Sequence, residues 1–366
     1  MAEPSEPQRR ARGNGAWRGV ARSALGVLEW LAATACLIGG LCVVSSGAGW
    51  RVDLAANLAG HWGWALPVVA AWMAVRRRWG RLGVAGAGLA LVLSVWLAPR
   101  AERVDPQRVP AERRVRVLHV NAGGMTPDAT GLVGMIRSSG ADIVAVTDCP
   151  TSLAREIWER RWVADLYPWC LRRPINANNP WQFVLSRWPI DDATAWGADA
   201  AEARPLTATV YRPGGALVFM LLHPLSPRTE ARWHTGNALA SLASAEAAGW
   251  IGRGWPVVAS ADLNATPTGH RAGLMRAGGL RQAAGRWERA GTYPAQRPWP
   301  WRVAIDDVWV GPGVRVASWR LAGSGPTQPG RDDGSDHEGV CVDLDVPAGR
   351  APGSSPPAPG YQTSVR

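Results

Sequence analysis

The chain has 366 residues, which is enough for one large domain or two, and its apolar fraction of 47% is ample for a core. The net charge is +11, yet the sequence contains no lysine, so all 40 basic side chains are arginine. Lysine Schiff-base chemistry and P-loop nucleotide binding are therefore excluded. The five scattered cysteines, without a Cys-x-x-Cys spacing, exclude a disulfide scaffold and a typical zinc site. The arginine excess fits either a biased genome composition or an attraction to anionic lipid or phosphate.

The first part of the chain contains three apolar stretches that predict transmembrane helices. A bilayer core about 30 Å thick requires roughly 20 apolar helical residues, and the stretches cover residues 24–48, 54–75 and 82–98. Residues 1–23 are polar and rich in arginine, and we expect them to form a disordered cytoplasmic tail. A cleaved signal peptide is the alternative for the first stretch, but that stretch is too long and further apolar segments follow it.

The arginines predict the orientation of these helices. The tail and the loop at residues 76–81 are strongly basic, and the positive-inside rule places both in the cytoplasm. Three crossings then place everything after Ala98 outside the cytoplasm, because a long domain translocates largely regardless of its charge. We therefore expect a multi-pass protein of the cell membrane with an exocytoplasmic domain. Glu29, in the first stretch, is expected to reach the membrane interface, with a functional acid inside the membrane as the alternative.

Beyond the apolar stretches, the sequence predicts one mixed domain. Residues 99–113 are rich in proline and charge and predict a linker, whereas residues 347–366 predict a disordered tail. Residues 114–346 alternate β-type runs with helical stretches, which indicates an α/β or α+β fold. The expected strands are 116–121, 142–147, 182–186, 206–211, 216–223, 256–260, 305–310 and 340–344. The expected helices are 129–137, 152–161, 228–251 and 269–277.

The stretch V-V-A-S-A-D-L-N-A-T-P at residues 257–267 is the most informative motif of this domain. Its apolar run predicts a strand that ends near Asp262 and Asn264, whose side chains point the same way because they are two residues apart. A carboxylate and an amide on one face suit a divalent cation, or a phosphate or water beside it. Taken alone, however, the stretch is more typical of a strand that ends in an Asx turn.

Polar residues of the same kind end or adjoin several other predicted strands. Any one of them is common at a strand end by chance, but six such elements in this order are not. They are Asn121 in V-L-H-V-N, Asp148 in A-D-I-V-A-V-T-D, His223 in F-M-L-L-H, the D-L-N motif, Asp306 in R-V-A-I-D-D-V, and the pair Asp336 and His337 in G-S-D-H-E.

The order of these motifs resembles that of the endonuclease/exonuclease/phosphatase superfamily, which shares the deoxyribonuclease-I-like fold. The resemblance covers residues 114–346 and is carried most specifically by D-L-N-A-T-P and G-S-D-H, with support from D-I-V-A-V-T-D, L-S-R-W-P-I and A-I-D-D-V. It implies an α/β domain built as a four-layer sandwich of two stacked, mixed or antiparallel sheets flanked by helices. The active site is expected at one end of that sandwich.

The resemblance also implies a role for each polar residue in metal-dependent hydrolysis of a phosphate ester. Mg²⁺ or Mn²⁺ is the expected cofactor, held by Asn121, Asp148 and Asp336. In the implied catalytic set, Asp262 and Asn264 position water and the phosphoryl group. His337 is the general base, and Asp306 orients it. His223 binds phosphate oxygens together with Asn264. A histidine paired with a carboxylate suits a base near neutral pH.

The sequence departs from the family pattern at a few positions. Asp148 stands where the family usually has glutamate as its principal metal ligand, and Ala261 replaces the glycine before the D-x-N pair. Asp307 stands where relatives often have histidine or tyrosine, so we expect different substrate contacts there. No role is expected for the remaining histidines, which are His61, His119, His234 and His270.

Three apolar spans followed by this domain look like the actinomycete teicoplanin-resistance membrane proteins of the VanJ type. This implies a bilayer-anchored phosphohydrolase for a phosphorylated cell-envelope substrate such as undecaprenyl pyrophosphate. One alternative is an exocytoplasmic nuclease or phosphodiesterase, although no interleaved basic and aromatic strip indicates nucleic acid. The other is a degenerate domain that binds a ligand without catalysis, given the change at Asp148. The sequence leaves the oligomeric state open.

Overall fold

The computed structural model describes the backbone of residues 6–62, 65–123, 130–174, 180–192, 204–285, 288, 291–298, 301–323 and 335–349. The chain divides into two compact units, Met1–Trp96 and Leu97–Arg366. We call them the helical unit and the domain.

The helical unit consists of consecutive helices. They are α1 (Glu6–Val44), the short 3-10 helix η1 (Ser46–Ala48), α2 (Trp50–Trp62), α3 (Ala65–Val75) and α4 (Trp79–Trp96). Residues 6–23, expected to be disordered, instead form the first turns of α1. Alanine, arginine and glutamine are good helix formers, and extension of an existing helix requires no new nucleus. Residues 1–5 of the expected tail lie outside the described residues.

Two segments of the described helices are long and apolar enough to cross a membrane, namely Ser23–Val44 of α1 and Trp79–Trp96 of α4. The prediction of a third spanning helix over residues 54–75 is wrong, because α2 and α3 divide that stretch. The second piece, α3, has only 11 residues and is therefore about 16 Å long. Pro67 accounts for this division. A proline lacks the backbone N–H and its ring clashes with the carbonyl four residues earlier, so a helix starts near Pro67 but does not continue through it.

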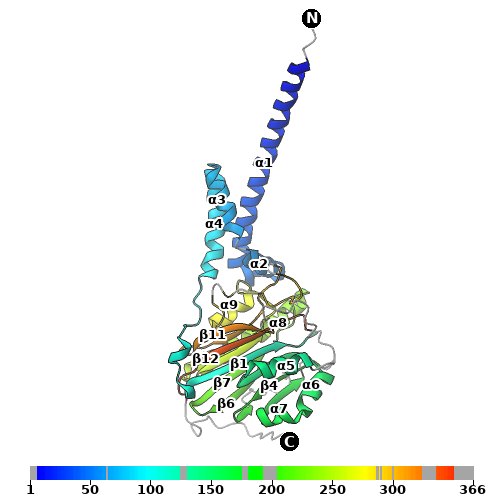
Figure 1. Ribbon diagram of the computed structural model, residues 1–366. Coiled ribbons are helices and arrows are strands. Elements are labelled where there is room, and N and C mark those ends of the chain that lie inside the picture. The colour runs from blue at the N-terminus through cyan, green and yellow to red at the C-terminus, as the bar shows by residue number, and fades with distance from the viewer. Residues whose placement is uncertain are drawn as a thin grey trace. The chain divides into compact units, whose positions relative to one another are not determined.

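The helices α1 and α4 pack side by side and run in the same direction (Figure 1). Glu29, early in the apolar part of α1, forms an ion pair with Arg81 at the start of α4. Farther along, Gly40 of α1 lies against Gly88 of α4. A Cβ atom on Gly88 would lie 2.2 Å from the carbonyl oxygen of Cys36, so this close approach requires glycine. The two apolar segments thus begin at one shared end and finish at the other.

The domain contains two six-stranded sheets (Figure 1). The first sheet has the order β11 (Arg315–Ala322), β12 (Gly339–Asp345), β1 (Arg114–Asn121), β2 (Ile143–Pro150), β4 (Pro180–Ser186) and β3 (Trp169–Pro174). The second sheet has the order β5 (Ile190–Asp192), β6 (Leu206–Arg212), β7 (Gly215–Leu222), β8 (Val257–Asp262), β10 (Asp306–Val310) and β9 (Arg281–Gln282).

Each sheet contains one parallel pair, and its other neighbouring strands are antiparallel. In the first sheet the parallel strands β1 and β2 are connected through α5 (Thr130–Ser139), and in the second β7 and β8 are connected through α8 (Glu230–Gly252). Parallel neighbours require such a crossover because the chain must return to the starting edge. The carboxyl ends of β1 and β2 consequently share one edge, as do those of β7 and β8.

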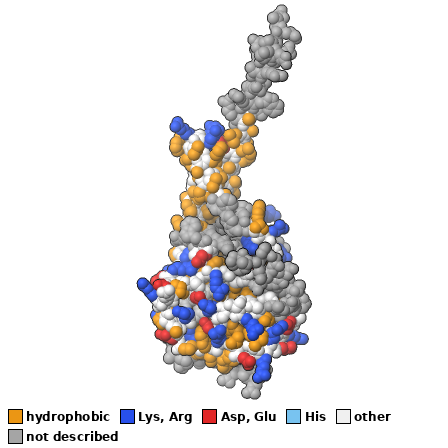
Figure 2. Space-filling view, in the orientation of Figure 1, with side chains coloured by type: hydrophobic (Ala, Val, Ile, Leu, Met, Phe, Trp, Pro, Cys, Tyr) orange, Lys and Arg blue, Asp and Glu red, His pale blue; other side chains and the backbone are white. Residues whose placement is uncertain are grey.

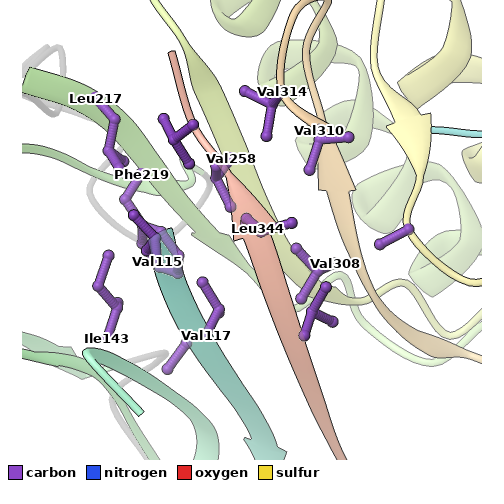
Figure 3. Packing of buried hydrophobic residues seen from close by; sticks show 14 of the residues in the cluster. Val115, Val117, Ile143, Leu217, Phe219, Val258, Val308, Val310, Val314 and Leu344 are labelled. Carbon is purple, nitrogen blue, oxygen red and sulfur yellow. The ribbon is translucent and has the colours of Figure 1, made fainter. Parts of the chain in front are cut away.

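Hydrophobic clusters hold four layers together. Between the sheets, side chains such as Val117, Phe219 and Val308 are fully buried (Figure 3). The outer face of the first sheet packs against α5, α6 (Thr151–Glu159) and α7 (Arg161–Leu166), and that of the second against α8 and α9 (His270–Ala277). The prediction of an α/β sandwich of two mixed sheets flanked by helices is therefore confirmed for the domain.

The strands that sequence analysis missed are the four edge strands. The eight expected strands correspond to the interior strands of the two sheets, whereas β3, β5, β9 and β11 went unpredicted. An edge strand pairs on one side only and is more exposed, so its sequence needs less apolar alternation. Strand β11 illustrates this, because most of its residues are only partly buried.

The segment before the domain differs from the expected linker. Residues 99–113 lie along the domain, with Ala101 and Val109 buried and the Val104 amide bonded to the carbonyl of Val316. The segment includes two short 3-10 helices, η2 (Pro106–Arg108) and η3 (Ala111–Arg113). The expected disordered tail falls mostly on residues 350–366, which lie outside the described residues.

We expect Gly88→Ala to separate α1 from α4. The new methyl group would overlap the backbone of Cys36, and overpacking of this kind costs about 1–3 kcal/mol. Gly86→Ala is the matched control, because a Cβ there meets nothing within 4 Å. Thermal unfolding of the purified protein in detergent, followed by circular dichroism, should show a lower midpoint for the first variant only. Equal midpoints for both variants would contradict the proposed packing.

Candidate active site

The strand directions gather the polar strand ends at one edge of the sandwich. Asn121 ends β1, and Asp262 ends β8. Strand β10 runs antiparallel to β8 and places Asp306 opposite Asp262. Strand β12 runs antiparallel to β1, so His337, two residues before β12, lies at the edge where β1 ends. The tertiary structure thus brings together residues that are more than 200 positions apart.

A chain of hydrogen bonds centred on Asp306 crosses from one sheet to the other. One carboxylate oxygen lies 2.9 Å from Nδ1 of His337, and the other lies 3.2 Å from Nε2 of His119 on β1. Nδ1 of His119 lies 2.8 Å from Oγ of Ser260 on β8. A carboxylate only accepts hydrogen bonds, so both histidines donate to Asp306. The amide of Asp306 also donates to Thr292 Oγ1 over 3.2 Å.

A second polar group surrounds Asp262. Nδ2 of Asn121 donates to Asp262 Oδ2 over 2.8 Å, and the backbone N–H of Asn264 donates to Asp262 Oδ1 over 2.7 Å. The second of these hydrogen bonds is the expected Asx turn, and it lies within the polar group around Asp262. Nε2 of His223 lies 3.4 Å from Asp262 Oδ2 and 3.3 Å from Asn264 Nδ2. Because Nδ1 of His337 is 3.9 Å from Asp262, the two polar groups adjoin.

The loop after β8 is fixed by a buried arginine of α9. Arg271 is fully buried and donates to the carbonyl of Leu263 over 2.9 Å and to Asn237 over 3.0 Å. Gly236 makes room for its guanidinium, since a Cβ there would lie 2.2 Å from it. Arg271 thereby stabilises the left-handed turn at Asn264, whose φ is 48°.

Asp148 reaches the site through a β-bulge. The register of β2 against β4 shifts between Val146 and Cys149, and Asp148 has a φ of 51°. Bulges and left-handed residues of this kind often re-aim a side chain at a functional site. A Cβ on Gly123 would lie 2.8 Å from Asp148 Oδ2 and 2.9 Å from Asn121 Oδ1. Glycine at position 123 therefore lets the two oxygens approach one another.

Ser335 and Asp336 directly precede His337 on the same segment. Ser335 Oγ accepts from the His337 amide over 3.0 Å and donates to the carbonyl of Asn121 over 2.8 Å, which ties this segment to the end of β1. Oδ1 of Asp336 lies 3.8 Å from Nε2 of His337, and its side chain is 43% exposed. Asp336 thus lies on the more accessible side of the ring. Tyr293 stacks obliquely on the same ring, with centroids 4.8 Å apart.

The carboxylates control the protonation of the site histidines. Burial lowers the pKa of His337, but the charge and hydrogen bond of Asp306, with the charges of Asp262 and Asp336, outweigh it and raise that pKa to about 10. Burial likewise lowers the pKa of His223, yet Asp262 raises it overall. Burial raises the pKa of Asp306, but His337 and His119 outweigh it and hold that pKa below its usual range. In the protein alone, these charges favour His337 as a cation.

A comparison with protein families places the chain in a known family. The Endonuclease/Exonuclease/phosphatase family matches residues 117–337, which begin in β1 and end at His337. The chain belongs to this family. Members of the endonuclease/exonuclease/phosphatase family are generally hydrolases of phosphoester bonds and generally use a divalent metal.

Solved structures of other family members share the fold. An endonuclease/exonuclease/phosphatase from Beutenbergia cavernae is 20% identical, with a TM-score of 0.50, over 64% of this chain and 72% of that one. Another from Bacteroides vulgatus is 16% identical, with a TM-score of 0.50, over 64% of this chain and 99% of that one. These similarities concern the fold of the domain. No curated protein matches the sequence.

The residues present fit a divalent cation in the place where Asp148 meets Asn121. Asp148 and Asn121 supply hard oxygen donors, and Asn121 Oδ1 retains a second lone pair beside its hydrogen bond from Gly123. Asp262, Asp306 and His337 also have donor atoms within 4.8 Å of one another. In that second group, however, Asp306 already bonds His337, so a metal there would have to replace this hydrogen bond. The second group is therefore already engaged in internal hydrogen bonds.

Asp307, where we expected substrate contacts to differ from those of relatives, is bound inside the domain. Its carboxylate is buried and accepts hydrogen bonds from the Trp319 indole over 3.0 Å and from the Ala284 amide over 3.2 Å. Burial raises its pKa to about 6. These partners direct the carboxylate to β11 and to the residues after β9.

Sequence analysis gave no role to His119 and did not single out Ser260. Both lie two residues before a recognised site residue, Asn121 and Asp262 respectively. Side chains two apart on a strand share a face, so this alternation was the available signal. It was overlooked because neither residue stands at a strand end.

We expect Asp306→Asn to lower the pKa of His337 from about 10 toward its ordinary value of about 6.5. The substitution removes the charge that contributes most to the elevation. Asp307→Asn is the matched control, because Asp307 bonds Trp319 rather than a histidine. Histidine-selective NMR titration of metal-free protein measures both. An unchanged His337 titration in Asp306→Asn would contradict the assigned pairing.

The same pairing links stability to pH. Because the folded pKa of His337 is about 10, above the unfolded value of about 6.5, its imidazolium stabilises the fold fully below pH 6.5. This contribution is lost as the pH rises from there through 10. Urea unfolding of the same metal-free samples measures the free energy of unfolding at each pH. Over this window, that free energy should decline less in Asp306→Asn than in the unsubstituted protein.

Proposed function

We propose that this protein is a membrane-anchored, Mg²⁺- or Mn²⁺-dependent phosphohydrolase with an exocytoplasmic active site. The observation that carries the proposal is the 2.9 Å pair of Asp306 and His337 beside the group around Asp262. A buried acid that orients a histidine next to convergent amide and carboxylate groups suits the addition of water to a phosphate ester.

The side chains divide the reaction between them. His337 takes the proton from the attacking water through Nε2, because Nδ1 is bonded to Asp306. Asp262 orients that water together with Asn264. His223, with its raised pKa, supplies positive charge to the phosphate oxygens. The water oxygen bonds to phosphorus while the bond from phosphorus to the leaving oxygen breaks.

The proposed metal residues are Asn121, Asp148 and Asp336. A bound divalent cation supplies positive charge that polarises the phosphoryl group. Its charge near Asp336 would also offset part of the negative field that favours protonated His337. This supports a histidine that becomes available as a base in the loaded site.

The helical unit supports the membrane location and orientation. Because α1 and α4 run in the same direction, the arginine-rich residues before Ser23 and the arginines at 76–81 belong to the same end of the pair. The positive-inside rule places this end in the cytoplasm. After α1 the chain returns through α2 and α3, and after α4 it continues at the opposite end. This arrangement supports an exocytoplasmic domain.

The proposed substrate is a lipid-linked phosphate or pyrophosphate of the cell envelope, such as undecaprenyl pyrophosphate. A membrane anchor keeps the site near substrates that remain in the bilayer, which raises their effective concentration. This would place the protein in a glycopeptide-resistance context of the VanJ type.

We expect the purified protein in detergent with Mg²⁺ to release phosphate from undecaprenyl pyrophosphate. His337→Ala should lower the rate about 100-fold or more, because it removes the base. His234→Ala on α8 is the matched control and should retain the rate, since that residue is exposed and bonds no site residue in the described structure. Nicking of plasmid DNA without phosphate release would favour the nuclease alternative. Titration calorimetry with Mg²⁺ or Mn²⁺, with Asp148→Ala as the comparison, measures metal binding. If no binding is detected, the result would favour a non-catalytic domain.

We further expect His119 to act as a positioning residue. His119→Ala should lower kcat about tenfold with little change in KM, because Asp306 loses one of its two orienting partners. His119→Gln keeps an N–H donor and should recover part of the loss, whereas a purely structural role would give two variants with activities that follow their melting temperatures. Phosphate release, measured with folded samples of both variants, provides the comparison.

A further inference from the structure

The turn between α3 and α4 carries a cluster of arginines around one glutamate. Nε of Arg76 lies 3.7 Å and Nε of Arg78 lies 3.3 Å from the carboxylate of Glu29, which also pairs with Arg81. Arg77 lies between the first two and has a left-handed φ of 53°. Four arginines against one glutamate leave three net positive charges at this turn. The Glu29 side chain is only 3% exposed and lies beneath the arginines.

Within the part of the chain that the structure describes, Glu29 engages only a few of the hydrogen-bond donors in this cluster. Each guanidinium has five N–H groups, whereas Glu29 offers two oxygens. The side chains of Arg76 and Arg78 are 39% and 45% exposed. Figure 2 shows basic side chains gathered at an end of the helical unit, beside an apolar surface. The cluster therefore presents fixed positive charge with unused donors.

An apolar groove of about 320 Å³ adjoins the cluster. One wall is α1 with Leu25, Leu28, Glu29 and Ala32, and the other is α3 with Val68, Val69, Trp72 and Met73. Leu28, Val68 and Trp72 are exposed, so the groove is open along its length. The guanidinium of Arg76 lies over the ring of Trp72, 5.7 Å from its centroid, which connects the cluster to the groove.

The position of the groove fixes the depth at which a ligand would lie. The apolar segments begin at Ser23 and Trp79, close to Glu29 and to the arginine turn. In a bilayer this level corresponds to the lipid phosphates, with acyl chains alongside the deeper residues. The short helix α3 ends at this turn and covers only part of α1, which leaves the groove between them.

We propose that this groove is a binding site for one anionic phospholipid. The arginine cluster binds the phosphate headgroup, and the groove between α1 and α3 binds the first part of an acyl chain. Charge complementarity selects the occupant, because a zwitterionic lipid brings a cation of its own to a cluster that already has an excess of positive charge. The site lies in the helical unit and uses none of the catalytic residues.

The test uses the full chain in a neutral detergent, with phosphatidylglycerol and phosphatidylcholine of identical acyl chains as probes. Native mass spectrometry measures the number of bound lipids and their apparent affinity. We expect one phosphatidylglycerol to bind at least tenfold more tightly than phosphatidylcholine. Equal affinities for the two lipids would overturn the assignment of headgroup recognition.

Variants separate this site from general attraction to charge. Loss of an arginine near an anionic headgroup costs about fivefold in affinity, so Arg77→Gln with Arg78→Gln should weaken phosphatidylglycerol binding roughly 25-fold. Arg51→Gln in α2 removes one positive charge elsewhere in the unit, as Arg77→Gln alone does at the turn, and should have no effect on binding. An equal loss in Arg51→Gln would overturn a defined site. Arg77→Gln alone keeps the ion pairs of Glu29 and should still weaken binding about fivefold, which guards against a folding defect.

A final pair of measurements tests the acyl groove and the identity of the occupant. Val68→Phe fills the groove at an exposed position and leaves the arginines in place, so it should weaken phosphatidylglycerol binding. Unchanged binding would contradict the groove. Competition by undecaprenyl phosphate at concentrations below those of phosphatidylglycerol would assign the site to the polyprenyl lipid and overturn the phospholipid proposal. These binding measurements need no hydrolysis, so they stand apart from the proposed enzymatic activity.

Discussion

A buried carboxylate shared by two histidines holds the two sheets together at the end where the active site lies. Asp306 belongs to the second sheet, whereas His119 belongs to the first, and His337 precedes the last strand of the first. A buried charge is costly unless hydrogen bonds and opposite charge satisfy it. The sheets must therefore stay in the one relative position that lets both rings reach Asp306. The hydrogen bond between Asn121 and Asp262 is a second link between the two sheets, next to Asp306. The same contacts therefore fix the fold and the geometry of the candidate site.

The domain divides its chemistry between a dry, ordered interior and a more accessible rim. His119 and Ser260 are fully buried and orient groups that lie closer to the substrate. Asp148 and Asp336 are more exposed, and they are the residues to which we assign the metal. The bulge in β2 and the missing side chain of Gly123 let Asp148 and Asn121 lie close together.

The helical unit uses a related device for a different purpose. Glu29 is buried against three arginines, and this ion-paired group fixes the shared end of α1 and α4. Glycines farther along both helices permit close backbone contact. Parallel packing of two apolar helices requires the intervening chain to return, and α2 and α3 lie in that connection. The excess of arginine over glutamate at the turn then remains as a surface charge suited to lipid.

The sequence by itself determined the interior strands, the α/β class and the identity of the strand-end residues, because these depend on local apolar patterns and on motifs whose spacing survives in one dimension. It did not reveal the four edge strands, whose pairing on one side only requires little apolar periodicity. It also did not divide the apolar residues 54–75 into two helices. Only the tertiary structure decided that His119 and Ser260 support Asp306, that Asp307 bonds Trp319, and that Glu29 lies beneath arginines. Each of these partners is far away in sequence or on another element, so contact between folded layers, and not local pattern, sets what each side chain does.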